Sequence, residues 1–180
     1  MHSTSTEGLS GRSVDELERF AAQPETDRLD VQTWEMMREL AVARMSDDRL
    51  AVDIRLRWVR LALTAIRKKA QGSDVDRKAA LAEETNVRVN AIRAFGAAQD
   101  GGLLDPVDLC ESVFREIGQT PEEVRTKAVL WRSLPPQEML RLRRVKNLLT
   151  PLRGVESLIP PGDPLHRELS AWLSVIPDLP

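Results

Sequence analysis

Few residues of this 180-residue sequence could carry out covalent or acid–base chemistry. The single cysteine, Cys110, lies beside Leu109 on an expected helix, where a thiol is usually buried and inert. Of the two histidines, His2 lies in a polar N-terminal leader and His166 has no nucleophile beside it in sequence. The sequence also lacks a glycine-rich phosphate loop and the spacing of Cys or His metal ligands. We therefore expect a protein that is not an enzyme and that needs no cofactor and no metal.

Four side chains rich in hydrogen-bond donors gather in one segment and could contact nucleic acid. They are Arg77, Arg88, Asn90 and Arg93. Arginine and asparagine pair well with base edges in the major groove of DNA, and arginine also pairs with phosphates. The sequence therefore predicts that these residues bind DNA, provided that the local fold turns them outward.

The residues around this set resemble a helix-turn-helix motif over 78–97. Ala82 supplies the small residue at which two helices cross, and Asn86, four positions later, tolerates the positive φ of a turn. The interior positions are apolar: Leu81, Val87, Ile92 and Phe95. The resemblance implies a second helix that docks in the major groove of double-stranded DNA.

Residues 78–106 are also similar to the start of a MerR-type regulator, because the segment 91–95 is followed by glycines at 101–102 and by Asp105 and Pro106. That family places a β-hairpin wing after this point, whereas residues 107–109 here run directly into an expected helix. The same apolar spacing would also suit one amphipathic helix, or a helical hairpin, over 74–98. A helical adaptor that binds a protein partner and does not contact nucleic acid is therefore the alternative.

Two further basic stretches are candidate partner-binding faces. They are Arg57, Arg60, Arg67 and Lys68 on an expected helix over 47–71, and Arg143 and Arg144 on a later helix. At about 100° per residue, each set falls on one side of its helix and could meet an acidic protein, phosphates or only water. Arg55 falls within the apolar arc of the first helix, so it must be paired or line an interface.

These residues should all lie on helices, because apolar residues recur at helical spacing along the chain and strand-like alternation is rare. Caps and breakers predict helices at about 14–22, 30–45, 47–71, 74–98, 106–117, 121–131, 137–149 and 164–175. A capping box of Ser13 and Glu16 should start the first helix, Gly72 and Gly118 should cap the ends of the third and fifth, and residues 100–102 should form a turn. Poor helix formers over 85–90 predict a break within the fourth of these.

The four tryptophans fall one to a helix, as core anchors would. They are Trp34, Trp58, Trp131 and Trp172. Trp172 follows a proline-rich stretch on the last helix, and because terminal helices are often only partly covered, it is also a candidate binding hot spot.

Composition sets the broader limits. Hydrophobic residues make up 42% of the sequence and charged residues 30%, which are globular values, and no apolar run is long enough for a membrane span. A net charge of -2 argues against a nucleic-acid coat or a polycationic membrane binder. We therefore predict an all-α, compact bundle of about 7–8 helices that forms one domain over 13–180 after a disordered leader at 1–12.

The amino-acid usage also bears on the setting in which the protein works. With one cysteine, no internal disulfide can form, which fits a reducing compartment. A sequence rich in Ala, Arg, Asp and Leu and without Tyr is typical of a high-GC bacterium. We expect a cytoplasmic, bacterial regulatory protein that has double-stranded DNA, a protein partner or a second copy of itself as its ligand and has no membrane contact.

Overall fold

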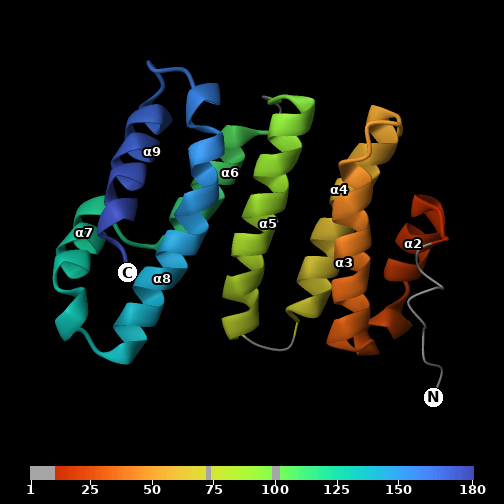
Figure 1. Ribbon diagram of the computed structural model, residues 1–180, viewed down its shortest axis with the longest axis horizontal. Helices are drawn as coiled ribbons and strands as arrows, with labels where there is room; N and C mark the ends of the chain where they lie inside the picture. Colours follow the sequence, from red (N-terminus) through yellow and green to blue (C-terminus); the bar gives the residue numbers. More distant parts are fainter. Residues whose placement is uncertain (1–10, 72–73, 99–101) are drawn as a thin grey trace. The chain divides into compact units, whose positions relative to one another are not determined.

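The computed structural model describes residues 11–71, 74–98 and 102–180, and every regular element in these ranges is a helix (Figure 1). Eight α-helices are present there, which confirms the predicted all-α fold. Nearly all of the leader predicted for 1–12 lies outside the described residues, as do Gly72, a predicted helix cap, and most of the turn predicted at 100–102.

The chain divides into two compact units, Met1–Val87 and Arg88–Pro180, and the boundary falls within helix α5. The prediction of one domain over 13–180 stays a prediction. Within the described ranges, no helix combines the length and the apolar character that crossing a bilayer requires.

The first unit contains α2 (Val14–Ala21), α3 (Val31–Met45), α4 (Val52–Lys69) and the first part of α5 (Asp74–Phe95), with a 3-10 turn, η1 (Pro24–Arg28), between α2 and α3. The predicted capping box at the start of α2 is present, because the Ser13 amide donates to Glu16 Oε2 at 2.8 Å and the Glu16 amide donates back to Ser13 Oγ. Asp30 caps α3 by accepting from the Thr33 amide at 2.7 Å. Helices α3 and α4 pack against each other, and α2 lies on α4.

Helix α4 begins five residues later than predicted. Asp47 instead starts a turn, in which its carbonyl accepts from the Leu50 amide at 3.1 Å and its carboxylate accepts from the Arg49 amide at 3.1 Å. Asp side chains compete with the helix in this way, and the helix begins only after Ala51, which makes no side-chain cap bond. Arg55 is paired, which is one of the two predicted alternatives: its Nε donates to the Met45 carbonyl at 2.8 Å and its guanidinium lies 3.3 Å from Asp48.

Helix α5 runs without interruption from Asp74 to Phe95, so the break predicted over 85–90 is wrong. The β-branched residues there are buried: Thr85 is 1% exposed, Val87 5% and Val89 3%. The Thr85 hydroxyl also donates to the Leu81 carbonyl of the preceding turn at 2.7 Å. Burial of these side chains outweighs their weak helix propensity, which is worth only a few tenths of a kcal/mol per residue, roughly.

The second unit contains α6 (Pro106–Ile117), α7 (Pro121–Val129), α8 (Pro136–Leu149) and α9 (Pro164–Val175), together with the last part of α5. Short 3-10 helices connect or follow them: η2 (Trp131–Ser133), η3 (Thr150–Gly154), η4 (Glu156–Leu158) and η5 (Ile176–Asp178). Each of these four α-helices has proline at its first position, where the missing N–H would have no helical partner. Gly118 ends α6 with a φ of 62°, as predicted.

Three of the four tryptophans are core residues, as predicted. Trp34 and Trp172 are each 1% exposed and Trp58 is 4% exposed. Trp172 stacks on Phe114 with ring centroids 5.8 Å apart, so it has no surface left for the predicted hot spot. Trp131 departs from the prediction, because it is half-buried in η2, after the end of α7.

Candidate interaction surface

Arg88, the central residue of the predicted DNA-binding set, is bound within the protein. Its guanidinium donates to the carbonyl oxygens of Leu103 at 3.2 Å and Gly102 at 3.1 Å, and it pairs with Asp108 at 2.9 Å. Only 12% of the side chain is exposed. These bonds attach the chain that precedes α6 to α5, and a DNA contact by Arg88 would require them to break.

The other three predicted DNA-binding residues, Arg77, Asn90 and Arg93, are exposed on α5. No non-glycine residue in the described ranges has a positive φ, so the structure has no turn at Asn86 of the kind that the helix-turn-helix resemblance implied. DNA binding through this set remains a prediction.

The predicted basic face of α4 is largely engaged in holding the first unit together. Arg57 Nε donates to Glu18 at 3.1 Å, and its terminal nitrogen also contacts Glu18 and Asp15, so it ties α4 to α2. Arg67 pairs with Glu84 of α5 at 2.8 Å. The hydrogen bonds to Glu18 and Asp15 raise the pKa of Arg57 above its ordinary value.

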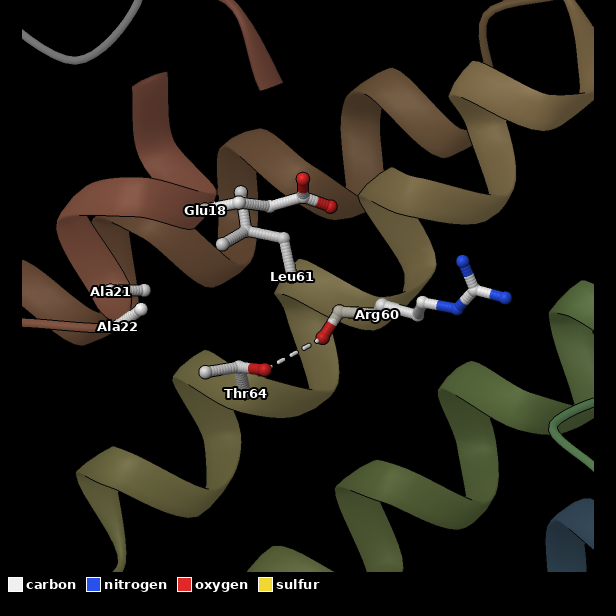
Figure 2. Close-up of a pocket in the computed structure, with 6 residues that line it drawn as sticks. All are labelled: Glu18, Ala21, Ala22, Arg60, Leu61 and Thr64. Carbon is white, nitrogen blue, oxygen red and sulfur yellow. Dashed lines mark hydrogen bonds between the residues drawn. The ribbon is translucent and has the colours of Figure 1, made fainter. Parts of the chain in front are cut away.

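Arg60 and Lys68 complete this face. Arg60 is exposed and forms no ion pair with any residue that the structure describes, and Lys68 is half-buried. A hollow of about 240 Å³ lies beside Arg60, and its lining residues are drawn in Figure 2: Glu18, Ala21, Ala22, Arg60, Leu61 and Thr64. The Thr64 hydroxyl donates to the Arg60 carbonyl at 3.0 Å, as an ordinary intrahelical bond. The hollow is small, and of its polar lining groups the Glu18 carboxylate is already bonded to Arg57.

A second hollow of the first unit, about 420 Å³, contains a charged network around Lys69. Lys69 Nζ lies 2.8 Å from Glu35 Oε2 and 3.0 Å from Glu83 Oε2, and Arg38 Nε donates to Glu35 Oε1 at 3.0 Å. The hydrogen bond from Arg38, followed by that from Lys69, lowers the pKa of Glu35 to about 2. Burial opposes the charge of Lys69, but its bonds to the two carboxylates outweigh this, so its pKa lies above the ordinary value. The network joins α3, α4 and α5 and is internally satisfied.

The residues suited to covalent chemistry do not converge. Cys110 is fully buried, and desolvation raises the pKa of its thiol to about 12, so it stays protonated near neutral pH. His166 is half-buried near the start of α9, where its amide donates to the Asp163 carbonyl at 3.0 Å. Among the described residues, no group of three or more His, Cys, Asp and Glu side chains could hold a metal ion.

The second unit exposes a run of apolar residues where α7 passes into α8. Val124 and Ala128, four residues apart, are buried on the inner side of α7. Val129 and Leu130 lie about 100° and 200° further around the helix. They therefore point away from the core, and they are 75% and 55% exposed. Such an exposed apolar run marks a binding surface more often than a single exposed side chain does.

Helix α8 also exposes an apolar residue on its outer side. Leu142 and Leu149 are 2% and 0% exposed on the inner side, whereas Leu140, about 200° from Leu142, is 52% exposed. Arg144 lies one turn beyond Leu140, and Arg141 is adjacent. We define the α7–α8 surface as Val129 at the end of α7, Leu130, Trp131 and Arg132 of the connection, and Leu140, Arg141 and Arg144 of α8.

Hydrogen bonds within and beside η2 order the connection. The Leu130 carbonyl accepts from the Ser133 amide and from its hydroxyl, both at 2.9 Å, and the Leu134 amide donates to the Trp131 carbonyl at 3.2 Å. The Arg132 guanidinium lies over the Trp131 ring, 5.4 Å from its centre. An open hollow of about 400 Å³ is lined by Val129, Leu130, Trp131, Arg132 and Ser133.

A chain of ion pairs ties the two helices together beside this connection. Lys127 Nζ lies 3.5 Å from Glu138 Oε2, and Arg141 lies 2.7 Å from Glu138 Oε1. In Figure 1 the connection is the loop where α7 ends and α8 begins. Of the residues predicted to bind a partner here, Arg143 is exposed and Arg144 is half-buried, and neither pairs with a carboxylate of the described residues.

The apolar half of this surface is absent from the sequence prediction, which treated 121–131 as one helix with Trp131 as a core anchor. A usable signal is present in the chain. Val124 and Ala128 occupy the inner stripe, so the two large apolar residues that follow cannot both face inward.

Comparison of the chain with protein-family models, with curated proteins and with solved structures finds no match.

Proposed function

We propose that this protein is a non-enzymatic helical interaction module that binds a protein partner through the α7–α8 surface. The observation that carries the proposal is the solvent exposure of Val129 and Leu130 in a connection that internal hydrogen bonds hold in place. Binding is weakened when flexible side chains and loops must become ordered, because conformational entropy is lost. A surface that is already ordered in the free protein avoids most of this loss.

The composition of the surface supports the same function. Interfaces are enriched in aromatic residues and arginine, and their strongest contacts often involve Trp and Arg. Trp131 and Arg132 stand together here, half-buried and exposed respectively. The basic face of α4 supports a partner role less well, because Arg57 and Arg67 are paired within the first unit.

Crosslinking inside cells tests this function. A photo-crosslinking amino acid is placed at Leu130, and for a matched control at Val52, which is 56% exposed in the first unit. We expect a discrete adduct at position 130 and none at 52. The captured protein is then purified, and its dissociation constant is measured with wild type and with a Val129→Ser/Leu130→Ser variant.

The double variant should bind at least about tenfold more weakly, because two apolar anchors are lost from the contact. Its unfolding midpoint in urea should stay near that of wild type, since both side chains are already in water in the free protein. Equal binding by the double variant would show that the partner binds elsewhere.

Fluorescence anisotropy with duplex DNA distinguishes the predicted DNA binding from the proposed protein interaction. Binding that weakens steeply with salt and is lost in an Asn90→Ala/Arg93→Ala variant would favour the nucleic-acid function over this proposal. We expect this variant to bind the captured protein like wild type.

A further inference from the structure

We infer that the α7–α8 surface accepts an acidic segment of its partner that carries large apolar anchors, an inference that rests on the proposed function. The first part of the argument is the charge along the chain that forms the surface. From Val129 to Leu149 the sequence has five cations and one carboxylate, Glu138. Lys127 and Arg141 already flank that carboxylate at 3.5 Å and 2.7 Å.

Three arginines therefore lack a carboxylate partner among the described residues. They are Arg132, Arg143 and Arg144. This differs from α4, where Arg57 and Arg67 meet acids of neighbouring helices. The unpaired cations of α8 and of the connection leave a positive potential that complementary acids of a partner would neutralise.

The apolar part of the surface determines which kind of anion fits. Val129, Leu130 and Leu140 are each more than half exposed. A phosphate backbone offers nothing apolar to cover them, whereas a peptide with Leu, Phe or Trp between acidic residues matches both chemistries. The observations therefore favour an acidic peptide over nucleic acid.

Arg132 is the residue best placed to receive a carboxylate. Its guanidinium is stacked over Trp131 at 5.4 Å, which limits its freedom before any partner binds. A planar guanidinium presents a fork of donors that fits a carboxylate with two parallel bonds. An apolar anchor of the partner in the hollow at 129–133 would bring a neighbouring acid to this group.

The test is a peptide selection with the full-length chain as the target. Random 16-residue peptides displayed on phage are selected on wild type and depleted on the Val129→Ser/Leu130→Ser variant. The enriched peptides are synthesised and their affinities measured by anisotropy at low and high salt. A duplex DNA of random sequence is measured beside them.

We expect enriched peptides with net negative charge and at least two large apolar residues. Their affinity should fall about fivefold or more when Arg132 and Arg144 are both replaced by Gln, and it should fall with salt. The matched control is Arg115→Gln/Arg167→Gln, which removes the same charge from exposed positions on α6 and α9 and should change affinity less than twofold, roughly.

The outcomes separate this inference from the function on which it rests. Neutral or basic peptides that need Val129 and Leu130 would overturn the acidic partner and leave the interaction module standing. Failure to enrich any peptide that needs these residues would overturn the peptide-binding surface itself. Duplex binding that depends on Arg132 and Arg144 would replace the acidic peptide with nucleic acid.

Discussion

The two units of this protein use similar basic helices in different ways. On α4, Arg57 and Arg67 meet carboxylates of α2 and α5, and Lys69 is enclosed by Glu35 and Glu83. On α8, Arg143 and Arg144 have no such partners among the described residues. A cation run of similar appearance in sequence can thus hold a fold together or remain available to a partner, depending on which acids the neighbouring helices present.

The exposed apolar side chains also differ between the two units. In the second unit, Val129 and Leu130 remain exposed at the end of α7, next to the unpaired Arg132. Among the described residues of the first unit, the large exposed apolar side chains are Val31 and Val52, each at the first position of a helix. Exposed apolar and unpaired basic groups together distinguish a surface that can bind from one that is only solvated.

The largest expected effect comes from breaking the Lys69 network. Lys69→Met keeps the aliphatic stem but removes the ammonium between Glu35 and Glu83, which leaves Arg38 as the one cation that contacts both carboxylates among the described residues. We expect a loss of about 2 kcal/mol in the free energy of unfolding, less than for a fully buried pair because the network is partly solvated. Urea unfolding at pH 7 measures it.

Arg144→Met is the matched control for this substitution, since Arg144 has no described carboxylate partner. It should change the free energy of unfolding by no more than about 0.5 kcal/mol. Equal losses in the two variants would remove the difference between the two basic helices.

A smaller effect tests whether the second unit is as closely packed as the first. A Cβ placed on Gly154 of η3 would lie 2.9 Å from Val89 Cγ1 and 3.3 Å from Arg93 Cδ. Val89 is 3% exposed and has little room to move, so Gly154→Ala should cost about 1–2 kcal/mol in thermal or urea unfolding. Gly162→Ala is the control, because no atom lies within 4 Å of its added Cβ, and it should be neutral or slightly stabilising.

The smallest effect concerns pH and belongs to the first unit alone. Because the pKa of Glu35 is lowered to about 2, its ionised form stabilises the fold above the ordinary pKa of 4.5. That contribution is lost as the pH falls from about 4.5 through about 2. Allowing for screening by solvent, Glu35→Gln should lower the free energy of unfolding by about 1 kcal/mol at pH 7.

In urea titrations, the difference in the free energy of unfolding between wild type and Glu35→Gln should shrink steadily below pH 4.5. Glu39→Gln is the control on the same helix, because Glu39 is 66% exposed and lies 3.8 Å from Arg38. If the loss of stability in Glu35→Gln stayed constant from pH 7 to 2, the ionised carboxylate of Glu35 would not be its source.

Local sequence signals were sufficient to predict most of the helices and their ends. The capping boxes at Ser13 and Thr120, the prolines at first helical positions and Gly118 each act within one turn of chain, so their effects can be predicted from neighbours alone. The same signals failed over 85–90, where burial of Thr85 and Val89 overrides a weak local preference.

The roles of individual side chains depended instead on residues distant in sequence. The composition and periodicity of the chain determine an all-helical fold with basic faces on two helices, because both follow from spacing along one helix. Whether Arg57, Arg88 or Arg144 finds an acid depends on contacts between helices, which spacing does not encode. The exposure of Val129 and Leu130 has the same origin, since only the packing of α7 shows which of its sides the rest of the unit leaves uncovered.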